Sequence, residues 1–126
     1  PITEIASNTA NEKPKTVILK NVFFGSGSAK LKSSSKTELD KLIVLLTENP
    51  TMKIQINGHT DNVGNPGVNQ LLSLNRATAV MNYLIENSIE TNRLTAKGFG
   101  ESEPIDTNNT EIGRKSNRRT EFLVLK

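Results

Sequence analysis

Residues 53–84, KIQINGHTDNVGNPGVNQLLSLNRATAVMNYL, decide the fold. Residues 53–57 alternate polar and apolar side chains, which is the pattern of a strand with one buried face. Asn65 and Pro66 then supply a helix N-cap and a proline at the first helical position. Apolar residues recur behind them at helical spacing: Ala77, Val80, Met81 and Leu84. The stretch therefore predicts a strand that leads through a turn into an amphipathic helix.

The preceding residues predict another strand and another helix. Residues 16–24 (TVILKNVFF) are rich in β-branched and aromatic side chains, which favours a buried strand. A loop follows, and Ser35 with Glu38 three residues later has the form of a capping box. The helix ends at Asn49, because a residue before proline avoids the α region. Its apolar face comprises Leu39, Leu42, Ile43 and Leu46.

Two further strands complete the expected domain. Residues 93–98 predict a short third strand, residues 100–117 a turn-rich connection and residues 119–125 a fourth strand. Strands separated by helices are joined by right-handed parallel crossovers, whereas the last strand can return antiparallel without a helix. The expected order is β-α-β-α-β-β. The fold class is α/β, an α+β two-layer sandwich with a mixed four-stranded sheet and the two helices on one face.

The chain length of 126 residues suits one domain. Residues 1–14 (PITEIASNTANEKP) are polar and aperiodic and are expected to form a flexible tether, with the folded domain at residues 15–126. Because the chain begins at Pro1 without a signal peptide, we expect a mature or excised piece of a longer protein. The longest aliphatic run, Leu42–Leu46, is five residues, far short of the ~20 that a membrane-spanning helix needs.

Composition and charge exclude several functional classes. The chain has no cysteine and a single histidine, His59, which excludes disulfide scaffolds, thiol catalysis and multi-histidine metal clusters. The net charge is +3, but residues 114–126 alone hold five Lys or Arg residues against one Glu, a charge of +4. The rest of the chain therefore carries −1. A patch this small suits one anionic group better than nucleic acid, and the aromatic platforms of single-strand binders are absent from the sequence.

The candidate binding site lies where the parallel strands are expected to end. In open α/β sheets, ligands bind beyond the carboxyl ends of the strands. Residues 24–27 and 59–62 follow two such ends, and an antiparallel last strand would begin at the same edge with residues 117–119. The first turns of the second helix, with Asn69, belong to that edge as well. Three separate segments and a helix end are thus predicted to converge.

Asp61 and Arg76 are the pair of interest at this edge. On the second helix Asn69, Leu72, Ser73 and Arg76 form a stripe beside the apolar face. An arginine at the border of a core is costly to desolvate unless a carboxylate or a ligand meets it. Spacing alone leaves two interpretations open: a structural salt bridge between Asp61 and Arg76, or a ligand site that uses both.

Other chemical motifs are weak. His59 and Asp61 could share a metal, but no third ligand of ordinary spacing follows, and a lone histidine at a strand end is more often structural. No nucleophile elbow accompanies His59. Gly98-Phe99-Gly100 lacks the third glycine of a dinucleotide fingerprint. We therefore expect no catalytic residue, no metal and no cofactor.

Several motifs in order resemble the OmpA/MotB C-terminal (OmpA-like) family of peptidoglycan-binding domains, over roughly residues 16–125. They are GHTDNVG at 58–64, NQLLSLNRA at 69–77, RL at 93–94, GFGE at 98–101 with Pro104, GR at 113–114 and NRR at 117–119. Each is weak alone, whereas the ordered set at family spacing is specific. The resemblance favours the ligand interpretation of Asp61 and Arg76.

The resemblance implies non-covalent anchoring of an outer-membrane or envelope protein to the cell wall, in the periplasm of a Gram-negative envelope. It implies that Asp61 and Arg76 clasp the meso-diaminopimelate of the peptidoglycan stem peptide, and that Thr60, Asn69, Leu72 and Arg118 line the same pocket. The tether would lead to an anchor outside this fragment. The chain departs from the family at Gly25-Ser26-Gly27, where members often have aspartate, a variable residue and asparagine. A polar contact from that loop is then missing or is supplied by main-chain N–H groups.

The alternative class is a cell-wall-acting hydrolase or accessory enzyme domain. Glycan hydrolysis needs two carboxylates that flank the scissile bond, and only Asp61 is expected at the edge. A peptidase would need a nucleophile with its base, or a third metal ligand. We therefore expect a binding module and not an enzyme.

Overall fold

The computed structural model describes residues 16–20, 22–25 and 27–125. The tether expected at residues 1–14 lies outside these ranges. The main elements follow one another along the chain as β1 (Thr16–Ile18), α1 (Lys36–Glu48), β2 (Lys53–Gly58), α2 (Pro66–Glu86), β3 (Leu94–Gly98), α3 (Glu111–Asn117) and β4 (Thr120–Leu125). Short 3₁₀ turns, Ser33–Ser35 and Thr91–Arg93, precede α1 and β3.

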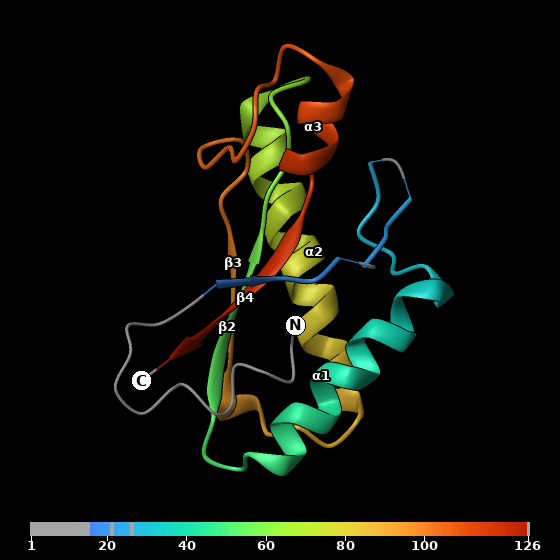
Figure 1. Ribbon diagram of the computed structural model, residues 1–126, viewed down its shortest axis with the longest axis vertical. Helices are drawn as coiled ribbons and strands as arrows, with labels where there is room; N and C mark the ends of the chain where they lie inside the picture. The colour runs from blue at the N-terminus through green and yellow to red at the C-terminus, as the bar shows by residue number, and fades with distance from the viewer. Residues whose placement is uncertain (1–15, 21, 26, 126) are drawn as a thin grey trace.

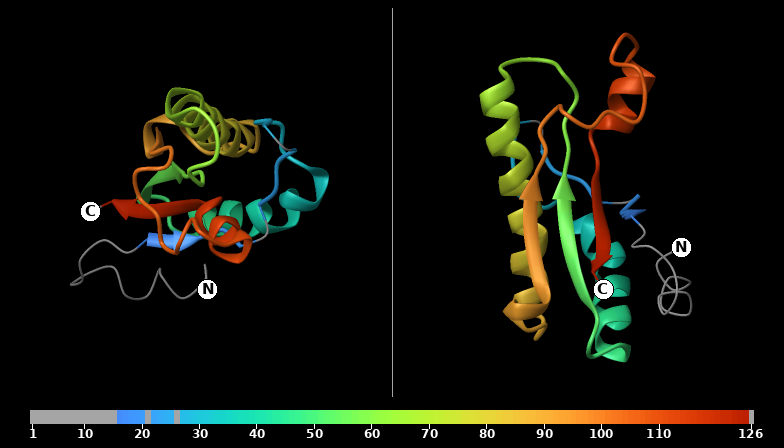
Figure 2. Two further views of the ribbon diagram at one scale, coloured as in Figure 1. Left: turned by 90° about the horizontal axis from the view of Figure 1, so that it is seen from above. Right: turned by 90° about the vertical axis from the view of Figure 1, so that its left-hand side faces the viewer.

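The four strands form one mixed sheet in the order β1-β4-β2-β3. β2 and β3 are parallel, whereas β4 runs antiparallel to both β1 and β2. Helices α1 and α2 cover the same face of the sheet (Figures 1 and 2). The predicted two-layer α/β architecture is therefore confirmed, and the carboxyl ends of β2 and β3 meet the start of β4 at one edge.

The core lies between this face of the sheet and the two helices. Its fully buried side chains come from every layer: Leu39, Leu42 and Leu46 of α1, Val80 and Leu84 of α2, Ile54 and Ile56 of β2, and Phe122 of β4. Burying one such side chain stabilises the fold by roughly 1.5–3 kcal/mol. The periodic apolar positions of the sequence are thus the positions that hold the layers together.

Helix α2 approaches the sheet closely where the strands end. A Cβ atom at Gly58 would clash with the main-chain oxygen of Ser73, and one at Gly98 would clash with the main-chain nitrogen of Leu74. The hydroxyl of Ser73 accepts a hydrogen bond from the main-chain N–H of Gly100 at 2.9 Å. These contacts fix the first turns of α2 against the edge that carries the candidate site.

The beginning of the domain differs from the sequence prediction. The first strand was expected over residues 16–24 but ends at Ile18. Beyond it, the hydroxyl of Ser35 accepts a hydrogen bond from the N–H of Phe23 and donates one to the Phe23 carbonyl, which also accepts one from the main-chain N–H of Lys32. The predicted capping box is also wrong, because Ser35 has helical dihedral angles and makes no side-chain cap.

A third helix, α3, was not predicted. Its seven residues are too few to show an amphipathic period, and Ile112 within it is 81% exposed. Thr110 caps it by accepting a hydrogen bond from the N–H of Gly113 at 3.0 Å. The helix projects at the end of the sheet where β2 and β3 terminate, just before β4 (Figures 1 and 2). It therefore adds side chains to the candidate site that the sequence prediction lacked.

Candidate ligand-binding site

The predicted convergence of segments is confirmed at the carboxyl end of β2. Asp61 follows β2, Arg118 precedes β4 and Arg76 projects from α2. Arg118 contacts Asp61 directly, and both residues shift the pKa of Arg76 through their charges. Asp61, Arg76 and Arg118 thus bring one carboxylate and two guanidinium groups together from three separate segments.

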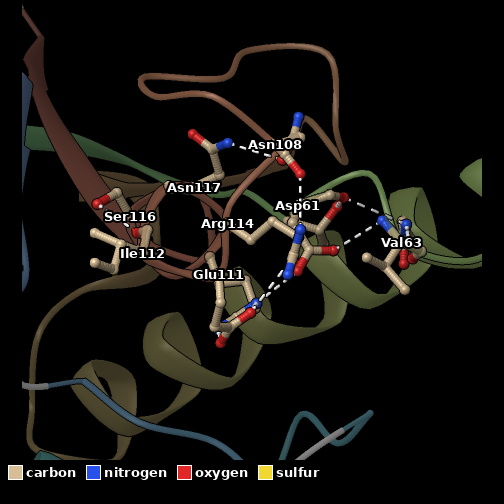
Figure 3. Close-up of polar contacts among 12 residues, drawn as sticks. Asp61, Val63, Asn108, Glu111, Ile112, Arg114, Ser116 and Asn117 are labelled. Carbon is tan, nitrogen blue, oxygen red and sulfur yellow. Dashed lines mark hydrogen bonds and ion pairs between the residues drawn. The ribbon is translucent and has the colours of Figure 1, made fainter.

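Asp61 is buried, with its carboxylate held in place by two different donors. Its Oδ1 atom accepts a hydrogen bond from the main-chain N–H of Val63 at 3.0 Å (Figure 3). Its Oδ2 atom accepts one from Nη1 of Arg118 at 2.7 Å. Only 10% of the Asp61 side chain is exposed. An ionised carboxylate offers about four lone-pair positions, so the two bonds leave acceptor capacity for an ammonium group.

Arg118 links Asp61 to α3. Its Nη2 atom donates to Oε2 of Glu111 at 2.7 Å, while its Nη1 atom holds Asp61. The hydrogen bonds that Arg118 donates to Glu111 and then to Asp61 raise the pKa of Arg118, and the bond to Glu111 lowers the pKa of Glu111. Glu111 is an acidic member of the site that sequence analysis missed, since nothing in its neighbourhood marked a helix or a partner.

Arg76 is half-buried and is held by the loop between β1 and α1. Its Nε atom donates to the main-chain oxygen of Ser28 at 2.9 Å, and its Nη2 atom donates to the main-chain oxygen of Gly25 at 3.1 Å. The guanidinium carbon lies 5.0 Å from the ring centre of Phe24. Burial, and then the charge of Arg118, lower the pKa of Arg76, whereas the charge of Asp61 raises it.

The structural salt bridge between Asp61 and Arg76 is not formed. Within the described ranges, Asp61 pairs with Arg118 and Arg76 bonds to main-chain carbonyls. The two charges therefore lie at one edge but do not satisfy each other.

Thr60 and Asn69 build the loop that carries Asp61. The main-chain N–H of Thr60 donates to the main-chain oxygen of Gly100 at 2.8 Å. The hydroxyl of Thr60 donates to the main-chain oxygen of Asp61 at 2.8 Å. The side-chain amide of Asn69 donates to the main-chain oxygen of Val63 at 2.9 Å, and it lies 3.5 Å from the main-chain oxygen of Asp61. Leu72 is half-buried on α2. The structure thus assigns supporting contacts to Thr60 and Asn69.

The loop at residues 25–27 was expected to lack a polar contact or to offer main-chain N–H groups. In the described residues, this loop contributes a main-chain acceptor and not a donor, because the Gly25 carbonyl accepts a hydrogen bond from Arg76. Ser26 lies outside the described residues.

His59 ties the strand ends together. Its Nε2 atom lies 2.8 Å from Oε1 of Glu121 on β4, and its ring stacks on Phe99 with centroids 5.1 Å apart. Arg119 lies 3.3 Å from the other oxygen of Glu121. Among the described residues, no group of three or more His, Cys, Asp or Glu side chains could hold a metal ion. The same residues include no helix with the length and hydropathy to cross a membrane.

The fold and this edge define the class of an α/β domain with a candidate polar ligand site where the strands end. The chain belongs to the OmpA family, whose sequence profile matches residues 23–118. It is 36% identical over 104 residues to outer membrane porin F of Pseudomonas fluorescens, which covers 82% of the chain and 32% of that protein. It is 35% identical over 103 residues to peptidoglycan-binding protein ArfA of Mycobacterium bovis, with 82% and 32% covered.

A solved structure shows the same fold. The crystal structure of a MotB-like protein from Desulfovibrio vulgaris superposes with a TM-score of 0.80 at 31% identity, over 88% of this chain and 72% of that one. The chain spans about a third of the length of the two sequence relatives named above.

Proposed function

We propose that this domain binds peptidoglycan without turnover and thereby anchors an outer-membrane or envelope protein to the cell wall in the periplasm. Membership of the OmpA family supports this function. So do the names of two relatives, a peptidoglycan-binding protein and an outer-membrane porin. The anchor itself would belong to parts of the protein beyond the 126 residues of this chain.

The ligand group is the free amino-acid end of meso-diaminopimelate in the stem peptide. Its ammonium would bind Asp61 and its carboxylate would bind Arg76, because a planar guanidinium matches a carboxylate with two parallel hydrogen bonds. One observation carries this proposal: Asp61 and Arg76 lie at the same edge, and each is held by other partners instead of by the other. Thr60, Asn69, Leu72 and Arg118 would line the pocket around them.

The test is a calorimetric titration of the chain with soluble muropeptides that differ at one position. Lysine lacks the carboxylate that diaminopimelate carries beside its side-chain amine, so the lysine-type muropeptide should bind at least ~tenfold more weakly. Arg76→Ala should lose a similar factor for the diaminopimelate form, and Arg76→Lys nearly as much, since an ammonium cannot reproduce the fork. Asp61→Asn should weaken both forms, because both carry the ammonium.

Lys115→Ala is the matched control, because it removes an exposed positive charge from α3 near the site. Its affinity should stay within about twofold of that of the unmodified chain. Equal affinity for the two muropeptides would contradict the assignment of Arg76. Soluble fragments released from purified sacculi would contradict binding without turnover and favour the hydrolase alternative.

A further inference from the structure

The loop between β1 and α1 has a defined shape at the point where it meets Arg76. The main-chain N–H of Ser28 donates to the Gly25 oxygen at 2.9 Å and closes a turn, in which Gly27 has a φ of 62°. Phe24 forms an isolated β-bridge with Leu31 across the base of the loop. Ser35 also fixes Phe23 through its hydroxyl group. The loop is therefore tied to the start of α1.

Both carbonyl contacts fall on the same edge of the Arg76 guanidinium. Nε and Nη2 form one side of this planar group, and they donate to Ser28 and Gly25 respectively. The ring of Phe24 faces the cation, with 5.0 Å between the guanidinium carbon and the ring centre. In the described part of the chain no acceptor bonds to Nη1, so the Nη1–Nη2 edge still has donor capacity for a ligand.

We propose that Phe24 and the carbonyl groups of Gly25 and Ser28 form a positioning clamp that presents only the Nη1–Nη2 edge of Arg76 to the ligand carboxylate. The proposal rests on the function proposed above and names the residues that decide how the carboxylate is recognised. In this loop, main-chain oxygens and an aromatic face make the described contacts to Arg76.

The clamp has a second consequence, which is to hold Arg76 apart from Asp61. Burial and the charge of Arg118 lower the pKa of Arg76, whereas the opposite charge of Asp61 attracts the guanidinium. A free arginine side chain would reach toward such a carboxylate, and the resulting pair would occupy both ligand contacts. The two hydrogen bonds to carbonyl groups and the cation–π contact oppose pairing of Arg76 with Asp61. The acceptor Asp61 and the donor Arg76 therefore stay separate and can each bind one end of a zwitterionic ligand.

The experiment uses the 126-residue chain and pairs of variants that differ only in the feature at issue. Phe24→Leu keeps an apolar side chain but removes the aromatic face, whereas Phe24→Tyr keeps that face. Gly27→Ala strains the turn at its positive φ, whereas Gly27→Asn tolerates this conformation. Each variant is titrated with the diaminopimelate and lysine muropeptides. The hydrogen exchange of the Arg76 Nε–H group is measured by NMR without ligand.

Phe24→Leu and Gly27→Ala should each reduce the preference for the diaminopimelate form at least ~threefold and speed exchange of the Arg76 Nε–H group. Phe24→Tyr and Gly27→Asn should retain both properties. An unchanged ligand preference and unchanged exchange in both disruptive variants would overturn the clamp, whatever their melting temperatures. If the unmodified chain binds the two muropeptides equally well but the disruptive variants exchange the Arg76 Nε–H group faster, the clamp does hold Arg76. The same result would refute the proposed function and the role of the clamp in ligand recognition.

Discussion

At the scale of single residues, the site keeps its opposite charges apart by giving each a different kind of partner. Asp61 is held by a main-chain N–H group and by Arg118, whereas Arg76 is held by carbonyl oxygens and an aromatic ring. The sequence predicted that Asp61, Arg76 and Arg118 would gather at one edge, because motif order and strand direction determine that. It could not predict the carbonyl partners, since every residue has a carbonyl and only the loop's conformation aims it.

Glu111 should influence ligand affinity through Arg118. This guanidinium is shared between Asp61 and Glu111, with 2.7 Å to each carboxylate. Glu111→Gln removes one of the two negative charges, so Arg118 should bind Asp61 more strongly and compete with the ligand ammonium. We expect a loss of roughly two- to fivefold in affinity for the diaminopimelate muropeptide, the scale of an exposed ion pair. Calorimetric titration measures it.

Because Arg118 lowers the pKa of Glu111, the difference between this variant and the unmodified chain should persist in mildly acidic buffer. Lys115→Ala again serves as the control for a change of charge on α3. Unchanged or tighter binding by Glu111→Gln would show that Arg118 does not compete for Asp61.

At the scale of elements, the periodicity of apolar residues predicted the helices and strand that pack in the core, but it did not predict α3, which lies outside the core. The helices α1 and α2 and the strand β2 carry regular apolar positions. The ends of α1 and β2 and the start of α2 lie within a residue or two of the predicted ones. β1 is shorter than predicted, and the backbone of Phe23 bonds to Ser35 and Lys32. α3 was missed because a cap and a buried asparagine hold it, and neither feature gives a repeating pattern.

Asn117 should be essential to the segment that carries α3. Its fully buried side chain accepts hydrogen bonds from the main-chain N–H groups of Ile105 and Asp106, and donates to the Asp106 and Asn108 oxygens. Asn117→Ala leaves these groups without partners, and each buried unpaired group costs about 1–3 kcal/mol. We expect the free energy of unfolding to fall by ~2–4 kcal/mol in denaturant titrations.

Asn109→Ala is the matched control, because Asn109 lies in the same loop with an exposed side chain and should change stability by less than ~0.5 kcal/mol. Asn117→Ala should also weaken muropeptide binding, since Arg118 is the next residue. Stability equal to that of the control would mean that the loop is held by other contacts.

At the scale of the whole molecule, strand order brings the site together. β4 lies between β1 and β2 and runs against both, so its first residues reach the edge where β2 ends. His59 after β2 and Glu121 on β4 form a cross-strand contact at that edge, with Arg119 beside it. The same sheet edge that gathers the ligand site therefore also concentrates ionisable groups, and the stability of the domain should depend on pH through them.

The free energy of unfolding should decrease in acid because of Glu121. Burial alone would raise the pKa of Glu121, but the hydrogen bond from His59 and the charges of His59 and Arg119 together bring it below its ordinary value. In the unfolded chain this pKa returns to about 4.3. Since the folded-state pKa is the lower one, the stabilisation is present above about pH 4.3 and is lost as the pH falls through the folded-state value.

Denaturant titrations at a series of pH values between about 7 and 3 check this expectation with Glu121→Gln, which keeps the side-chain shape without the charge. The unmodified chain should be more stable than the variant at neutral pH, and the gap should close in acid, because protonated Glu121 and glutamine are both uncharged. Glu103→Gln, at an exposed position, should show no gap at any pH. Parallel curves for the unmodified chain and Glu121→Gln would mean that ionised Glu121 does not stabilise the strand ends.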